Sequence, residues 1–173
     1  MSNLLKVTLC EKKGFREEEM VKLLKGLNYL QQVVNSDYFK TWVLNFEWMG
    51  KVQFANNAGL TNEQVYDRIM SGVEVLRPER DNEMDIYLTI YNTYVTGRNV
   101  IGYTYPSSSM QYINRRFFAI FSPHQVAANL LHEWCHKIGF DHDFKATRAR
   151  PFSVPYAVGG FIAIGHDKFF VEK

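Results

Sequence analysis

The feature that most constrains this chain is the segment His132–His142, which reads HEWCHKIGFDH. Residues four apart lie on the same face of a helix, so His132 and His136 project side by side. Gly139 has no Cβ and can adopt the left-handed conformation that ends a helix, which lets His142 return toward the first two rings. Three converging imidazoles are the ligand set of a catalytic zinc site, whose fourth position is left for water.

The same segment supplies a carboxylate. Glu133 follows the first histidine directly, so it can lie beside a metal-bound water as a general base without binding the metal. The full pattern HExxHxxGxxH is far more specific than HExxH alone, which arises by chance in many chains. A helical wheel at about 100° per residue separates an apolar side from a histidine side. The apolar side holds Ala127, Leu131, Trp134 and Ile138, and the histidine side holds Gln125, Asn129, His132 and His136.

This pattern resembles the metzincin clan of zinc endopeptidases, which includes the astacins, serralysins and matrix metalloproteases. Residues 132–142 carry the likeness, and the chain from about residue 5 fits the layout of the clan. The resemblance implies an α+β fold with a metzincin-like twisted mixed sheet, two packed helices, an active-site helix and a very small C-terminal subdomain. It also implies one catalytic Zn²⁺ on His132, His136 and His142, with Glu133 as general base and proton shuttle in peptide-bond hydrolysis.

Periodicity and capping residues predict the elements around this segment. Alternation or β-branched and aromatic content predicts strands, whereas apolar residues at helical spacing predict helices. The resulting helices span 16–35, 61–71 and 122–138, the second opening with a Thr61–Gln64 capping box and the third with Ser122-Pro123. The resulting strands span 4–10, 38–48, 84–93, 100–105 and 115–121.

Two further stretches are candidates for the substrate cleft. In metzincins an exposed edge strand rims the cleft and substrate pairs with it, and Gly102, Tyr103 and Thr104 are the candidate rim strand; an ordinary hairpin is the alternative. The clan is also named for a methionine turn beneath the zinc, and no methionine follows Met110. Its nearest counterpart is 153–157, SVPYA, where proline replaces methionine. Tyr156 is either a residue that reaches the metal or the oxyanion, or a packed tyrosine.

Two neighbours of the motif are assigned smaller roles. Cys135 lies on the side of the helix away from the histidines, which favours a small buried residue over a metal ligand. Asp143 follows the third histidine directly and is a candidate acceptor for an imidazole N–H.

Length and charge constrain the number of domains and the kind of partner. A chain of 173 residues predicts a single catalytic domain, 1–173, with an upper subdomain at about 1–139 and a lower one at about 140–173. A net charge of +2 points to neither nucleic acid nor an anionic membrane. The resemblance implies a peptide or protein substrate as the partner, and the chain is expected to be a monomer. No signal peptide is visible at the N-terminus, so the expected location is cytoplasmic, or outside the cell after release without a classical signal.

Two other functions remain open from the sequence. The first is a non-proteolytic binding module of the same fold that holds zinc structurally, which the missing methionine favours and the intact Glu133 disfavours. The second is a zinc hydrolase acting on a non-protein amide, such as a cell-wall peptide.

Overall fold

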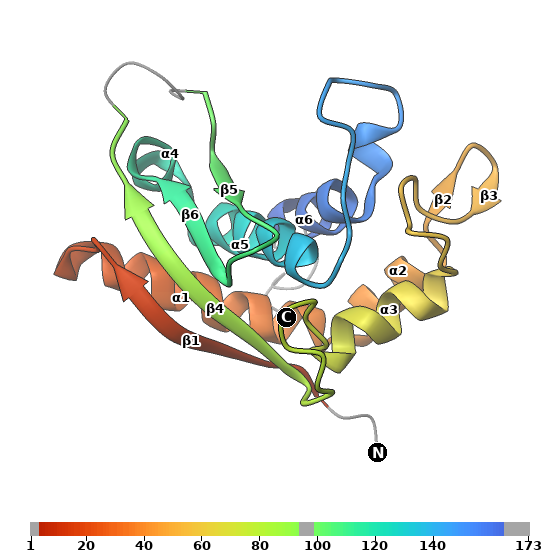
Figure 1. Ribbon diagram of the computed structural model, residues 1–173, viewed down its shortest axis with the longest axis horizontal. Helices are drawn as coiled ribbons and strands as arrows, with labels where there is room; N and C mark the ends of the chain where they lie inside the picture. The colour runs from red at the N-terminus through yellow and green to blue at the C-terminus, as the bar shows by residue number, and fades with distance from the viewer. Residues whose placement is uncertain (1–3, 94–98, 165–173) are drawn as a thin grey trace, which may run out of the picture.

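The sheet organises the fold. The computed structural model describes residues 4–93 and 99–164, and these residues form a mixed α+β structure (Figure 1). Four strands lie in the order β1–β4–β6–β5, with β1, β4 and β6 mutually parallel and β5 antiparallel to β6. Their bounds are β1 Lys6–Lys13, β4 Glu83–Tyr91, β5 Gly102–Thr104 and β6 Met110–Asn114; a separate hairpin pairs β2 Glu47–Trp48 with β3 Lys51–Val52.

Helices cover one face of this sheet. Figure 1 shows α1 and α5 lying behind the strands, and each contacts the sheet as well as the other helix. Alternate residues of β4 point into this layer: Met84, Ile86, Leu88 and Ile90 are buried, and their neighbours in the strand are half-exposed. The helices are α1 Glu17–Val34, α2 Asp37–Leu44, α3 Asn62–Ser71, α4 Arg115–Ile120, α5 Pro123–Lys137 and α6 Val154–Ile164, with a 3₁₀ turn at Arg150–Phe152.

Several predicted elements are confirmed. The helix predicted over 16–35 is α1, the strand over 84–93 is β4, and the strand over 4–10 is β1, shifted along the chain to 6–13. The capping box of Thr61 and Gln64 opens α3, and Gly72 ends it in the left-handed conformation at φ 72°. Ser122 likewise caps α5 in a second capping box with Gln125.

Two predicted strands are wrong. Residues 38–48 begin as the helix α2, because Ser36 caps it by accepting from the Phe39 backbone N–H and because Phe39 and Val43, four apart, share its buried face. Residues 115–121 form α4 instead of the last strand. The side chain of Asn114 caps this helix, and the strand beside β4 is β6, which ends at that same Asn114.

The nearest counterpart of the methionine turn, 153–157, is not a turn, because all but its first residue belong to the start of α6. This helix lies along α5 (Figure 1). Gly159 permits their close approach, since a Cβ at that position would stand 3.1 Å from the Ala128 carbonyl oxygen and 3.4 Å from the Cβ of His132. Across residues 4–93 and 99–164, no helix combines the length and apolar character needed to cross a membrane.

Candidate metal site

The three histidines of the motif converge. Their ring centroids lie 5.3 Å apart for His132 and His136, 5.2 Å for His132 and His142, and 5.0 Å for His136 and His142. Each ring offers one nitrogen, and these nitrogens all lie within 4.8 Å of one another. Within the described ranges, this is the only group of histidine, cysteine or acidic side chains arranged so that one metal ion could be held.

Local structure produces this convergence. The first two histidines lie one turn apart near the end of α5, whose backbone continues to a cap at Ile138. Gly139 then takes φ 90°, a left-handed conformation that side chains rarely adopt, and turns the chain away from the helix axis. His142 follows three residues later and returns to the other two rings, as the glycine in the motif predicts.

Hydrogen bonds orient each ring. Nδ1 of His136 lies 2.8 Å from the Phe140 carbonyl oxygen and 3.1 Å from Oδ1 of Asp141, and Nδ1 of His142 lies 3.1 Å from the carbonyl oxygen of Asp143. The ring of His132 donates to the backbone carbonyl of Pro155. Such acceptors fix the tautomer and leave the opposite nitrogen for a metal.

Burial favours the neutral form of His132 and His136, which is the form that binds a metal. Burial lowers the pKa of His132 to about 3, with a further lowering from the neighbouring His136 and His142. Burial also lowers the pKa of His136, against the opposing effect of its hydrogen bond to Phe140. Three imidazoles form the donor set, which suits zinc or another borderline divalent ion.

Glu133 lies next to this cluster. Its side chain is only 5% exposed, and burial raises its pKa to about 7, against opposing effects from the charge of Lys137 and a hydrogen bond from the Asn129 side chain. A carboxyl group with a pKa near neutrality can accept and release a proton at physiological pH. Asn129 lies one turn before Glu133 on the same helix. The helical wheel places it on the histidine side, but the sequence alone does not indicate its contact with Glu133.

A pocket of about 460 Å³ opens beside these residues. Helix α5 forms one wall and α6 another, and the segment leading into β5 forms the rim. The side chains that line it are mostly small or apolar. They belong to Asn99, Val100, Ile101, Gly102, Phe121, Gln125, Ala128, Asn129, His132, Glu133, Arg150, Tyr156, Gly159, Gly160 and Ala163.

The predicted rim strand is found at the edge of the sheet, because β5 pairs with β6 and is last in the strand order. Gly102 lines the pocket, and a Cβ there would approach Oδ1 of Asn129 to 2.8 Å, so the absence of a side chain lets the strand lie against α5. The side chains of the other two rim residues engage the sheet: Tyr103 stacks on Tyr112 at 4.6 Å, and the Thr104 hydroxyl donates to the Met110 carbonyl.

Tyr156 comes to the site from α6. Its ring centroid lies 4.6 Å from that of His132 and 4.7 Å from that of His142, and its hydroxyl accepts a hydrogen bond from Arg150. The position of this tyrosine follows from the helical start of α6 and not from the turn that the sequence predicted. Arg150 was missed altogether, because nothing in its local sequence indicates that the 3₁₀ turn returns to the motif.

Asp143 accepts from an imidazole, as predicted, but it does so through its backbone carbonyl oxygen, which lies 3.1 Å from Nδ1 of His142. The carboxylate of Asp143 accepts from Asn56 at 3.1 Å and from the Thr147 hydroxyl, and these two hydrogen bonds lower its pKa. The carboxylate that contacts an imidazole is that of Asp141. Cys135 is fully buried, as expected of a packed residue, and burial raises the pKa of its thiol.

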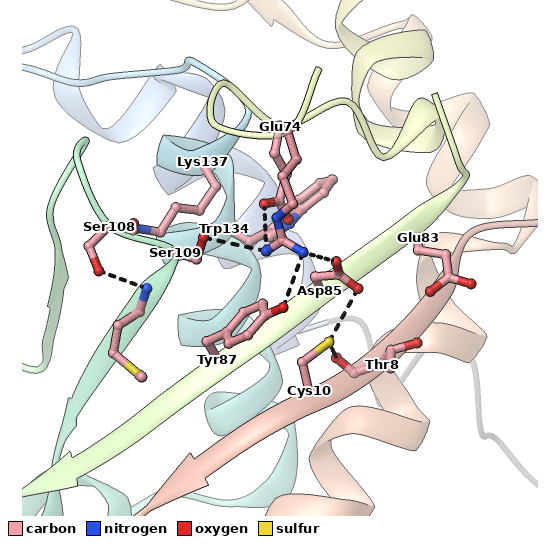
Figure 2. Close-up of polar contacts among 12 residues, drawn as sticks. Thr8, Cys10, Glu74, Glu83, Asp85, Tyr87, Ser108, Ser109, Trp134 and Lys137 are labelled. Atoms are coloured by element: carbon pink, nitrogen blue, oxygen red, sulfur yellow. Dashed lines mark hydrogen bonds and ion pairs between the residues drawn. The ribbon is translucent and has the colours of Figure 1, made fainter. Parts of the chain in front are cut away.

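The far side of α5 is held by polar contacts (Figure 2). Nε1 of Trp134 donates to Glu74 at 2.9 Å, and Glu74 pairs with Arg77 at 3.4 Å. Nζ of Lys137 donates to the carbonyl oxygens of Tyr105, at 3.0 Å, and Ser108. These contacts tie the end of the histidine-bearing helix to the loop between β5 and β6, so the rim strand and the histidines are positioned together.

Comparison with protein-family models finds no match, and comparison with curated proteins finds no similar sequence. The assignment of this site therefore rests on the geometry described above and on the motif.

Proposed function

We propose that this protein is a zinc-dependent endopeptidase of the metzincin type. The observation that carries the proposal is the combination of three converging histidines with a buried carboxyl group on the wall of a pocket that an edge strand borders. A structural metal site would be closed and would have no need of a base beside it. The candidate ion is zinc, which would be held by His132, His136 and His142 and would supply a nucleophilic water and polarise the scissile carbonyl.

The chain itself would bind the substrate at the rim. The backbone of β5 at the sheet edge offers hydrogen-bonding groups to an extended peptide, which would add as a further strand. Gly102 lets β5 lie against α5, so a peptide paired with this strand would run near Glu133. The pocket between α5 and α6 would take one side chain of the substrate.

Glu133 would move the proton. Its carboxylate would accept a proton from the attacking water as the new C–O bond forms, and would pass that proton to the nitrogen of the leaving amine as the C–N bond breaks. Asn129 would hold the carboxylate in place through its hydrogen bond. The hydroxyl of Tyr156 accepts from Arg150, so its own hydrogen would remain available to the oxyanion that develops on the carbonyl.

The test is a digest of a peptide library by the zinc-loaded protein, with the fragments identified by mass spectrometry. We expect internal cleavage that a chelator abolishes, and a loss of about 10²–10⁴-fold in Glu133→Gln with the zinc retained. Glu79→Gln is the matched control, since Glu79 is exposed. Zinc binding without any fragments would instead support the non-proteolytic module, and cleavage of peptidoglycan alone would support the hydrolase of a non-protein amide.

A further inference from the structure

One positively charged side chain, that of Arg150, lines the pocket. Among the described residues that line it, the charged side chains are Glu133 and Arg150, and most of the others are small or apolar. The arginine comes from the 3₁₀ turn before α6, so it stands on a different element from the metal ligands.

The guanidinium of Arg150 lies on the metal side of the pocket. Its central carbon stands 4.9 Å from the ring centroid of Tyr156, and that ring contacts two of the three histidines. Its positive charge also contributes to the low pKa of His132, although burial is the larger cause. A group bound by this guanidinium would therefore lie next to the reacting atoms.

Within the described ranges, Arg150 has no carboxylate in ion-pair distance. Its hydrogen bonds go to two neutral oxygens, the carbonyl of Phe144 at 3.3 Å and the hydroxyl of Tyr156. Its Nε is buried and makes no hydrogen bond. Asp143 feels the arginine charge at longer range, but the carboxylate of Asp143 is bound by Asn56 and Thr147. Arg150 as a whole is half-buried, with its Nε enclosed, and an arginine that is partly withdrawn from water and has no carboxylate partner favours an anionic ligand.

We propose that Arg150 makes the cleft selective for peptides that carry a carboxylate beside the scissile bond. The planar guanidinium presents N–H groups in a geometry that matches a carboxylate, and the apolar pocket around it strengthens the interaction by excluding water. The carboxylate is that of an internal aspartate or glutamate, or that of a free C-terminus, since both have the same chemistry. This proposal rests on the proposed function, which makes the pocket a peptide-binding cleft, but it can be tested by peptide binding alone.

The experiment measures peptide affinity by fluorescence anisotropy on zinc-loaded Glu133→Gln protein, which keeps the metal ligands and does not turn over. The peptides differ in one residue, aspartate or asparagine, and each is made with a free and an amidated C-terminus. We expect the carboxylate form to bind about 10- to 100-fold more tightly than the carboxamide form. Which pair shows the difference identifies the source of the carboxylate. Equal affinities across both pairs would overturn the proposal.

Variants then assign the effect to one side chain. Arg150→Gln should abolish the preference, Arg150→Lys should retain part of it, and Arg150→Glu should reverse it toward a lysine-containing peptide. Arg148→Gln is the matched control, since it removes the same charge from an exposed position two residues away and should leave the preference unchanged. A preference that survives Arg150→Gln, or falls equally in Arg148→Gln, would contradict the assignment.

The comparison of aspartate with asparagine peptides uses the Glu133→Gln protein with Arg150 intact, so it does not depend on whether the arginine variants fold. It is also separate from the proposed function: the absence of cleavage by the zinc-loaded wild-type protein would refute the endopeptidase, whereas indifference to the carboxylate in binding would refute the role of Arg150.

Discussion

Replacing Glu133 with glutamine should stabilise the metal-free protein, although it should abolish catalysis. The pKa of this buried carboxyl is raised from the usual 4.5 to about 7, mainly by burial. The folded protein therefore keeps a proton that the unfolded chain releases between those two pH values. The stability contributed by the carboxyl is fully present below the unfolded pKa and is lost as the pH rises through the folded one.

The magnitude follows from the two pKa values. At about 1.4 kcal/mol for each pH unit, a carboxyl displaced from 4.5 to about 7 costs the folded state about 3 kcal/mol once the pH exceeds 7. Glutamine has nearly the same shape, carries no charge and can still accept the hydrogen bond from Asn129. For a chain of this length, the gain corresponds to a rise in melting temperature of about 6–12 °C.

The assay is urea denaturation with a chelator present, at pH 5 and at pH 9. We expect Glu133→Gln to be more stable than wild type by about 3 kcal/mol at pH 9 and by less than about 1 kcal/mol at pH 5. Glu79→Gln, at an exposed position, should change little at either pH. A gain that is equal at the two pH values, or a loss at pH 9, would refute the argument that this carboxylate is held in the folded protein against its preference for water.

Three further predictions concern the elements around the site. Gly139→Ala should lower the free energy of unfolding by about 1–2 kcal/mol and weaken zinc binding, because residue 139 has φ 90°. Gly160→Ala is the control: Gly160 lies in α6, and a Cβ added there would meet no atom within 4 Å, so thermal unfolding should show no loss of stability. In metal-free protein the pKa of His132 is lowered to about 3, so stability should fall as the pH drops below about 6.5, where the unfolded chain takes up the proton. His132→Gln should flatten this decline in urea midpoints measured from pH 7 to 4, and an unchanged slope would contradict the assignment. Trp134→Phe should lower the free energy of unfolding by about 1–3 kcal/mol, because the buried Glu74 carboxylate loses its 2.9 Å hydrogen bond. In a double-mutant cycle, the same substitution made in a Glu74→Ala background should lower it by less.

The cluster of three histidines was predictable from the sequence because the geometry of the motif is local. A helical repeat fixes the first two histidines, and a glycine that takes a positive φ delivers the third. The α+β class and the helices with strong caps were predictable for the same reason, since the capping boxes at Thr61 and Ser122 mark where each helix starts.

The elements that the sequence misassigned are short and rich in aromatic residues. In 38–48 the aromatic content indicated a strand, but the spacing of Phe39 and Val43 and the cap at Ser36 agree with a helix, and packing against the core decided the outcome. In β6 the residue that shares a face with the buried Ile113 is the polar Gln111, and the last residue, Asn114, is also polar and buried. The strand therefore lacks the apolar alternation that would have revealed it.

The cleft could be predicted only in part, because its walls come from distant segments. Tyr156 and Arg150 reach the histidines through the packing of α6 on α5, which depends on the close approach at Gly159. Periodicity within a single chain does not reveal a contact of this kind. Asn129 is an intermediate case, because its helical phase placed it on the correct face, but its contacts with Glu133 and Gly102 depend on tertiary structure.

Titration calorimetry of the metal-free protein with zinc measures whether three imidazoles share one ion. We expect one zinc per chain and a loss of affinity of more than about 100-fold in His142→Ala, whereas His124→Ala should bind zinc as wild type does, because His124 packs on Tyr29 outside the cluster. No zinc binding by the wild-type protein, or equal affinities in His142→Ala and His124→Ala, would contradict the account.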